Sequence, residues 1–271
     1  MSSAPPPVPF RDPAGSLVFL GTGTSVGVPT VGCGCAVCMS DDPRNKRTRT
    51  SVLLGLPGGT LLIDTTPDLR TQLLRERIGR VDAVLYTHDH VDHLYGLDDV
   101  RPLCHWRGGP IPVWCEEQVE KRIRKAFDYA FQPMPLPGGG IPKLEFERIG
   151  EDPFELLGCR VVPLRLRHGV FDVLGFRFGD VAYCTDTNLI PEETFERLAG
   201  LDVFIVDCLR HTRHPTHFSL EESLAAAKRV QAKRTILVHL GHELDHEATS
   251  KTLPPGVEMA WDGLVVPLSG V

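Results

Sequence analysis

Short apolar runs alternate along the chain with longer segments whose leucines recur at helical spacing. The runs are bounded by glycine, proline or aspartate, which is typical of strands in a folded domain. We predict strands over residues 17–23, 51–56, 60–65, 81–86, 111–116, 143–149, 159–168, 173–180, 181–187, 201–208 and 234–241. We predict helices over residues 68–79, 116–127 and 219–231.

Local signals mark where several of these elements turn or end. The sequence PGG at 57–59 separates two apolar runs and predicts a β-hairpin. Gly79 is a plausible end of the first helix, and Ser219 with Glu222 forms a capping box at the start of the last one. The proline- and glycine-rich residues 128–142 predict a long surface loop, of the kind that serves as a lid or a binding loop.

The order of the elements indicates the architecture. Hairpins are followed by alternating strands and helices, and this order occurs twice. Two sheets packed together and covered by helices would satisfy it, which favours a mixed α/β architecture, although periodicity does not fix the topology. We expect residues 1–16 to form a loose proline-rich tail and residues 17–271 to form a single domain.

Composition and charge exclude some classes of protein. The net charge of -6 and the pI of about 6.0 argue against a general nucleic-acid coat, so nucleic acid is an unexpected partner. No apolar run is long enough to span a bilayer, and the N-terminus lacks the apolar segment of a signal peptide. We therefore expect a cytoplasmic protein whose eight cysteines are thiols or metal ligands rather than disulfides.

The segment THDHVDH at 87–93 holds the densest group of metal-seeking side chains. It follows the predicted strand 81–86 and contributes His88, His90, Asp92 and His93. Imidazole and carboxylate groups suit zinc, manganese or iron. His88 and His90 face the same way in an extended segment, while Asp92 and His93 would begin a helix. One metal does not need all four groups, so the segment favours two metals close together.

Further ligands are expected at the ends of later strands. His168, Asp186 and His239 each follow an apolar run, which would place them at the rim of a sheet, where sites are commonly built. Any one of the three, taken singly, is as well explained as a buried histidine or a capping aspartate. Two divalent cations among these ligands leave the site positive, which matches the charge of a phosphodiester.

This pattern, HxHxDH followed by His, Asp and His, resembles the metallo-β-lactamase superfamily of binuclear hydrolases. The resemblance implies an α+β fold, a four-layer αβ/βα sandwich. It also implies two divalent active-site metals, manganese or zinc. One would be held by His88, His90 and His168, the other by Asp92, His93 and His239, with Asp186 bridging.

The resemblance implies supporting residues as well. Asp64 matches the early aspartate of the superfamily, which supports the site from behind without being a ligand. We interpret Asp89 as an orienter of the ligands. Cys184 lies two residues before Asp186 and can face the same way on a strand, but we prefer Asp186 as the bridge because the strand should end there.

A second cluster lies in GTGTSVGVPTVGCGCAVC at 21–38. Its glycines do not match the dinucleotide fingerprint, so a Rossmann site is rejected. Cys33, Cys35 and Cys38 predict one structural zinc, with His242 as the best fourth ligand. An iron–sulfur cluster and free buried thiols are the alternatives.

These motifs together narrow the resemblance. CxCxxC after GTGTSVGVP, then RTRTS, HxHxDH and VHLGH, resembles the PhnP-type phosphodiesterases. That resemblance implies a small anionic substrate and hydrolysis of 5-phospho-α-D-ribosyl 1,2-cyclic phosphate to the 1,5-bisphosphate. It implies His217 as general acid, although His217 can also be a supporting residue at a helix N-terminus. A homodimer is expected.

Other interpretations remain open. Arg47 and Arg49 alternate along an edge and either bind a substrate phosphate or form an ordinary solvated strand edge. A tRNA 3′-processing nuclease is disfavoured because HEAT at 246–249 follows His239, whereas that family has it before the last ligand. A PqqB-like non-hydrolytic protein is disfavoured by the intact ligand set. A binding module with structural metals is the rival from another class.

Overall fold

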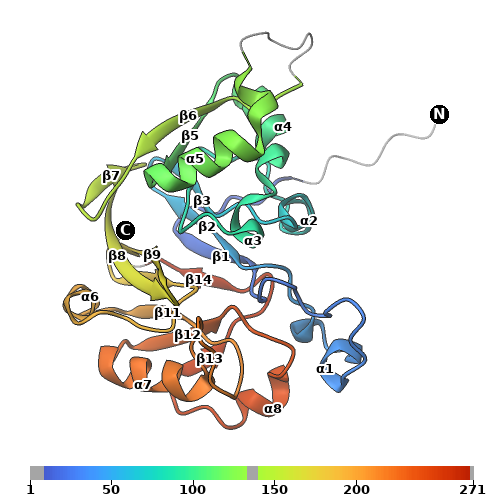
Figure 1. Ribbon diagram of the computed structural model, residues 1–271, viewed down its shortest axis with the longest axis vertical. Helices are drawn as coiled ribbons and strands as arrows, with labels where there is room; N and C mark the ends of the chain where they lie inside the picture. The colour runs from blue at the N-terminus through green and yellow to red at the C-terminus, as the bar shows by residue number, and fades with distance from the viewer. Residues whose placement is uncertain (1–8, 133–139, 269–271) are drawn as a thin grey trace.

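The computed structural model describes residues 9–132 and 140–268. Two seven-stranded sheets lie face to face at the centre, and helices cover the outer face of each (Figure 1). The order of layers is helix, sheet, sheet, helix, so the α+β four-layer αβ/βα sandwich is confirmed. Among the described residues, no helix is long and apolar enough to cross a membrane.

Sheet one has the order β14-β1-β2-β3-β4-β5-β6. Its strands are β1 (Ser16–Gly21), β2 (Ser51–Leu56), β3 (Gly59–Ile63), β4 (Ala83–Leu85), β5 (Ile111–Cys115), β6 (Leu144–Arg148) and β14 (Val265–Pro267). The first strands pair antiparallel, and β2–β3 is the predicted hairpin. From β3 to β6 the pairing is parallel, so the carboxyl ends of these strands meet at one edge.

Sheet two has the order β13-β12-β11-β10-β9-β8-β7. Its strands are β7 (Phe154–Leu156), β8 (Cys159–His168), β9 (Phe171–Phe178), β10 (Val181–Cys184), β11 (Val203–Asp207), β12 (Arg234–Val238) and β13 (Val257–Met259). The hairpins β7–β8–β9 are antiparallel, whereas β10 to β13 are parallel. This sheet therefore also presents a row of carboxyl ends at one edge.

The helices are short apart from two. They are α1 (Ala36–Met39), α2 (Leu69–Arg75), α3 (Val91–Leu94), α4 (Arg101–Arg107), α5 (Glu117–Ala126), α6 (Glu192–Arg197), α7 (Leu220–Val230) and α8 (His246–Ser250). In the described part of the chain, the remaining helical elements are the 3-10 turns η1 (Pro43–Asn45), η2 (Leu97–Val100) and η3 (Asp128–Phe131). The capping box of α7 is confirmed, because Ser219 N donates to Glu222 Oε2 at 2.9 Å and Ser219 Oγ accepts from Glu222 N.

Alternation along the strands divides the apolar core into layers. On β1, Leu17 and Phe19 face sheet two, while Val18 and Leu20 face the helices. One core layer lies between the sheets, one between sheet one and helices α2 to α5, and one between sheet two and helices α6 and α7. Burial of both faces explains why central strands such as β2, β4, β10 and β11 are almost uniformly apolar.

Three expectations about segments need adjustment. The first helix ends at Arg75, before the predicted Gly79, because Arg77 takes a left-handed φ of 57°. A Cβ added at Gly79 would lie 2.7 Å from the Phe10 ring. Phe10, near the end of the predicted tail, therefore contacts the domain. Of the loop expected over 128–142, residues 128–131 are helical and residues 133–139 lie outside the described residues.

Candidate metal centre

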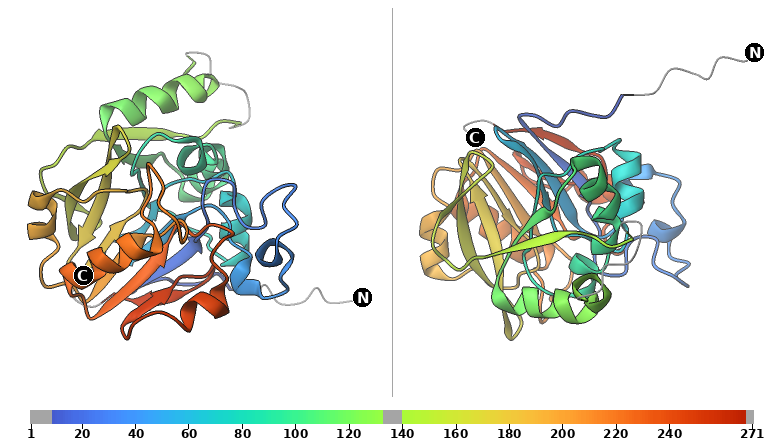
Figure 2. Two further views of the ribbon diagram at one scale, coloured as in Figure 1. Left: turned by 60° about the horizontal axis from the view of Figure 1, so that its bottom comes forward. Right: turned by 90° about the horizontal axis from the view of Figure 1, so that it is seen from above.

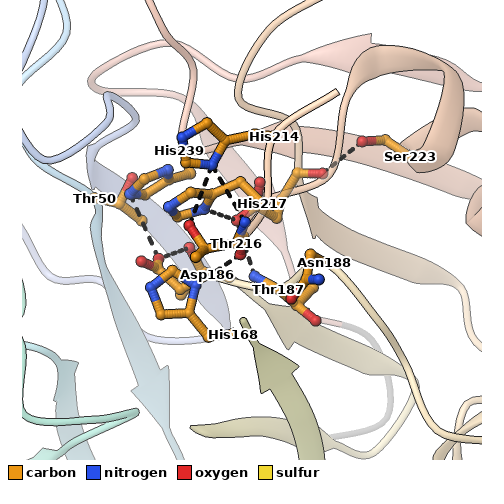
Figure 3. A network of polar contacts seen from close by, with 12 residues as sticks. Thr50, His168, Asp186, Thr187, Asn188, His214, Thr216, His217, Ser223 and His239 are labelled. Atoms are coloured by element: carbon orange, nitrogen blue, oxygen red, sulfur yellow. Dashed lines mark hydrogen bonds and ion pairs between the residues drawn. The ribbon is translucent and has the colours of Figure 1, made fainter. Parts of the chain in front are cut away.

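The histidines and aspartates predicted as active-site ligands lie at the carboxyl ends of strands or in the helix that follows one. The segment with His88 and His90 follows β4, and Asp92 and His93 lie in helix α3, as predicted. The other candidates come from sheet two, where His168 ends β8, Asp186 follows β10 and His239 follows β12. Figure 3 shows His168, Asp186, His217 and His239 turned towards a common point. Residues separated by up to 151 positions thus form one centre.

The candidate ligands form two sets that share one residue. In the first set, His88, His90, His168 and Asp186 have ligand atoms that all lie within 4.8 Å of one another. In the second set the same holds for Asp92, His93, His239 and Asp186. Every active-site ligand predicted from the sequence is therefore brought into one of the two sets.

The two carboxylate oxygens of Asp186 face different sets. Oδ1 lies 3.2 Å from His93 Nε2 and 3.5 Å from His239 Nε2. Oδ2 lies 3.8 Å from His88 Nε2. A carboxylate in this position can serve two cations at once, one through each oxygen.

Nitrogen atoms without hydrogen-bond partners test whether a metal fits. His88 Nε2, His93 Nε2 and both ring nitrogens of His239 are buried and have no hydrogen-bond partner. Leaving a buried polar atom unsatisfied costs about 1–3 kcal/mol, so such atoms rarely gather without a reason. Imidazole nitrogens and carboxylate oxygens are the donors that zinc, manganese and iron prefer. The donor set therefore fits divalent metals.

Hydrogen bonds at the far side of three rings turn Nε2 toward the centre. Thr87 Oγ1 donates to Asp64 Oδ2 at 2.8 Å, so His88 Nδ1 is the donor in its 2.9 Å bond to Thr87 Oγ1. His93 Nδ1 donates to Asp64 Oδ2 at 2.8 Å. His168 Nδ1 donates to the Thr216 carbonyl at 2.7 Å. Partners of this kind orient metal-binding histidines and fix their tautomer, which is the role expected for Asp64.

Backbone strain concentrates at the same place. Asp64, Asp186 and His239 have φ values of 64°, 55° and 61°, in the left-handed region that non-glycine residues rarely adopt. Each residue lies just after a central strand, where the chain leaves the sheet. Strain of roughly 1–3 kcal/mol per residue persists only where the surroundings enforce it, and it clusters at functional sites.

The electrostatics of the centre call for a cation. Burial opposes ionisation of Asp186, but His239 and His93 hold its pKa well below the ordinary value. Burial lowers the pKa of His88 well below its usual range, which leaves a neutral imidazole. Burial opposes protonation of His93, but Asp186, Asp92 and Asp64 raise its pKa well above the usual range. Three carboxylates thus surround one ring, and divalent cations would supply the missing positive charge.

The sequence analysis did not identify Asp207, which the structure places beside the predicted acid His217. His217 Nδ1 donates to Asp207 Oδ2 at 2.7 Å, and the His217 ring is stacked on His239 with centres 4.5 Å apart. Burial alone would lower the pKa of His217, but the buried Asp207 carboxylate outweighs it and raises the pKa to about 9. An aspartate at the end of the apolar run LDVFIVDC was the available signal, because that position resembles those of Asp186 and His239.

Two residues near the centre take no direct part in it. Asp89 is expected to orient the ligands, but its carboxylate is 39% exposed and lies 3.9 Å from Arg122 Nε. None of its described contacts joins it to a ligand, because the odd positions of an extended segment face away from the even ones. Cys184 packs in the apolar layer behind sheet two. Asp186 therefore lies between the two ligand sets, and Cys184 does not.

The cysteine cluster assembles as predicted. Cys33, Cys35, Cys38 and His242 have ligand atoms within 4.8 Å of one another, and His242 Nδ1 lies 3.3 Å from Cys33 Sγ and 3.4 Å from Cys35 Sγ. The Cys38 amide and the His242 ring lower the pKa of the Cys35 thiol to about 6. Three thiols and one imidazole at this separation are the donor set of a closed zinc site.

Arg47 has a role that neither sequence interpretation anticipated. Its side chain is 2% exposed, so it is neither a solvated strand edge nor a phosphate ligand at the surface. Its Nη1 donates to the Gly241 carbonyl at 2.8 Å, and its Nη2 donates to the carbonyl of Leu244 at 2.6 Å. Arg47 therefore ties the N-terminal loop to the segment that carries His242. Arg49 pairs instead with Asp68, at 3.0 Å.

Comparison with known proteins identifies the family to which this fold belongs. A model of the beta-lactamase superfamily domain matches residues 60–240 of the chain. A crystal structure described as a new diphosphatase from the PhnP family superposes with a TM-score of 0.88 and 43% sequence identity, covering 94% of this chain and 98% of that one. The chain belongs to the beta-lactamase superfamily and, within it, to the PhnP family.

Two curated relatives are longer proteins. A Porphyromonas gingivalis protein named octanoyltransferase is 39% identical over 251 residues, which is 91% of this chain and 50% of that protein. Coenzyme PQQ synthesis protein B of Rhodopseudomonas palustris is 29% identical over 175 residues, which is 52% of this chain and 55% of that protein. The chain thus spans about half the length of both relatives.

Proposed function

We propose that this protein hydrolyses phosphodiesters, with two divalent cations at the shared histidine and aspartate centre. The observation that carries the proposal is the position of Asp186, whose two carboxylate oxygens face separate ligand sets. Centres with two neighbouring divalent metals serve in-line displacement at phosphorus. A phosphate with two ester or anhydride bonds carries one negative charge and suits a site with a net positive charge.

We assign the first cation, manganese or zinc, to His88, His90 and His168. The second cation is assigned to Asp92, His93 and His239, with Asp186 between the two. Divalent cations at such a centre lower the pKa of water to about 7 and stabilise negative charge on the phosphate.

The residues of the chain supply the remaining functions. Asp64 and Thr87 hold the rings of His93 and His88 in orientation through the bonds described above. We assign to His217 the transfer of a proton to the leaving oxygen, because its ring borders both His168 and His239, at 4.6 Å and 4.5 Å between ring centres. Asp207 would keep His217 protonated at Nδ1 and leave Nε2 facing the substrate.

We assign a third metal, a structural zinc, to the cysteine cluster. The cluster joins the N-terminal loop to the turn after β12, three residues beyond the candidate ligand His239. This zinc would stiffen the segment that carries His239 without touching the substrate.

We also propose a cytoplasmic protein that forms homodimers. None of the eight cysteines forms a disulfide, which fits a reducing compartment.

Two substrate types deserve direct comparison. The first is 5-phospho-α-D-ribosyl 1,2-cyclic phosphate, whose expected product is the 1,5-bisphosphate. The second is a diphosphate esterified at both ends, because the PhnP-family structure with 43% identity is described as a diphosphatase. Both present a phosphorus atom with two ester or anhydride bonds.

Phosphorus NMR of the manganese-loaded protein with each compound tests the proposal. We expect new phosphate signals with at least one of them, and His88→Ala should abolish the reaction because it removes one of the first cation's ligands. Val265→Ala, at an exposed apolar residue of β14, is the control for handling and loading. Bound manganese with no turnover of either compound would contradict the proposed substrate class.

A further inference from the structure

Three exposed large apolar residues are close in sequence to ligands of the first set, and one of them, Phe171, contacts His90. Val91 is 48% exposed, Val170 is 86% exposed and Phe171 is 57% exposed. Val91 follows His90 in the chain, and Val170 and Phe171 closely follow His168. We call Val91, Val170 and Phe171 the apolar rim. Exposed apolar residues that gather at one place mark binding surfaces, whereas scattered ones need no explanation.

Phe171 is the member of the rim with a defined orientation. It pairs with His168 across the β8–β9 ladder, so the two side chains lie on the same face of sheet two. The centre of its ring lies 5.8 Å from that of His90, edge to face at 86°. This contact fixes the ring, while more than half of the side chain stays accessible. A fixed, accessible aromatic ring is a platform on which a flat group can stack.

The charged residues of the same hairpin do not face this platform. Arg167 Nη1 pairs with Asp172 Oδ1 at 2.8 Å. Arg167 precedes His168 and Asp172 follows Phe171, so both charged side chains lie on the opposite face of the sheet. The face with Phe171 therefore favours an uncharged ring over a second phosphate group.

A series of ring contacts shows where Phe171 lies relative to His217. His217 lies 4.6 Å from His168, His168 lies 5.0 Å from His90, and His90 lies 5.8 Å from Phe171. Phe171 is thus at the far end of this row from His217. Since the proposed function assigns the leaving oxygen to His217, Phe171 faces the part of the substrate that keeps the phosphate.

We propose that Phe171 stacks on a nucleobase-like ring in the part of the substrate that keeps the phosphate. This inference rests on the proposed function and narrows its substrate class to nucleotide diesters and nucleotide diphosphates. A substrate with only a sugar and phosphates would leave the apolar rim uncovered.

Two substrates with the same leaving group test the proposal. Thymidine 5′-(p-nitrophenyl phosphate) and methyl p-nitrophenyl phosphate both release p-nitrophenolate, which leaves without a proton, so His217 does not enter the comparison. In manganese-loaded Phe171→Ala, we expect kcat/KM for the thymidine ester to fall roughly 5-fold to 150-fold and kcat/KM for the methyl ester to change by less than about twofold. Phe171→Trp should retain the preference for the thymidine ester.

Trp106→Ala is the matched control, because Trp106 is an aromatic residue of α4 with 77% exposure. Equal losses on both esters would overturn the proposal, since Phe171 would then only support His90. Unchanged kinetics on both esters would overturn it as well. A change of Phe171→Ala from dimer to monomer in light scattering, with the thymidine preference intact, would assign the rim to contact between two copies of the chain.

Calorimetry separates this proposal from the proposed function. The probes are thymidine 5′-phosphate and ribose 5-phosphate, each titrated into the manganese-loaded wild-type protein and into Phe171→Ala. If thymidine 5′-phosphate binds more tightly than ribose 5-phosphate, and Phe171→Ala removes the difference, the platform is supported even when neither ester is cleaved. Absence of cleavage would contradict the proposed hydrolysis instead. Equal binding of both probes would overturn the platform.

Discussion

At the residue scale, the centre depends on aspartates that the sheets hold in place. Asp64, Asp186 and Asp207 each stand at the end of an apolar strand and are fully or almost fully buried. Burial makes their charge costly unless histidines or cations compensate it. Asp64 and Asp207 therefore hold histidine rings, while Asp186 lies between two ligand sets. One residue type thus serves two roles, which are set by its neighbours.

The pair His217 and Asp207 gives a prediction about pH. A general acid must be protonated, so with a pKa raised to about 9 His217 retains its function below that pH and loses it as the pH rises further. In Asp207→Asn, burial dominates and lowers the pKa of His217, so the alkaline loss of activity should begin at lower pH. We expect kcat at neutral pH to fall by roughly 10²- to 10⁴-fold with an alkoxide leaving group. A pH profile of kcat measures both effects.

Asp207→Asn also tests whether the loss of activity comes from proton transfer to the leaving group. With p-nitrophenolate as leaving group, Asp207→Asn should keep kcat within about threefold, because that group needs no proton. Asp152→Asn, at an exposed carboxylate, serves as the control. A similar loss with both leaving groups would assign Asp207 a purely structural role.

At the element scale, the N-terminal loop and the turn after β12 act as one unit. The blue loop with α1 lies beside the red C-terminal segment in the left view of Figure 2. Arg47 joins them through backbone carbonyls, and Asn45 Nδ2 donates to Asp245 Oδ2 at 2.9 Å. The cysteine cluster adds Cys33 and Cys35 against His242. A small apolar cluster of Val28, Val37 and Cys38 supports this unit, so polar bonds contribute much of its cohesion, and the proposed zinc would add to them.

Removing one cysteine should release the zinc and weaken the unit. We expect Cys35→Ala to lose one tightly held zinc and to lower the free energy of unfolding by roughly 4 kcal/mol, because metal binding contributes directly to folding. Metal analysis and chemical denaturation measure the two effects. Cys159→Ala, at a buried thiol of β8, should keep all of its zinc. A stable Cys35→Ala protein with unchanged zinc content would refute the structural zinc.

At the scale of the whole molecule, the candidate metal centre lies at one edge of the two sheets and combines residues from both. Sheet one supplies His88 and His93 from the segment after β4, and sheet two supplies His168, Asp186 and His239. The apolar layer between the sheets fixes their relative position. Cations bound by ligands from both sheets would therefore stabilise the folded state as a whole.

Metal removal should lower the melting temperature. A ligand that binds only the folded state stabilises it by about 2.7 kcal/mol at 100 times its dissociation constant. For a chain of this size that corresponds to roughly 5–10 °C. Calorimetry of chelator-treated protein, with stepwise return of manganese, measures the shift. A melting temperature that does not depend on manganese would contradict cross-sheet metal binding, and His88→Ala should show a smaller shift than the wild type.

Regular patterns in the sequence determined much of the fold. The long buried strands and the helices α5 and α7 have clear periodicity and end signals, so they were predictable. Three-residue strands such as β7, β13 and β14 were not, because they are too short to show a pattern. The short helices α4 and α6 likewise lack a strong signal.

Part of the candidate site could likewise be predicted from the sequence, and the rest depended on the tertiary structure. The metal-seeking residues were visible in the sequence because their residue types are rare together and follow apolar runs. The contact of Asp207 with His217, the exclusion of Asp89, the burial of Arg47 and the exposure of Phe171 were decided by the tertiary structure. Each depends on which segment packs beside which, and distances between segments far apart in the chain are not encoded in local patterns.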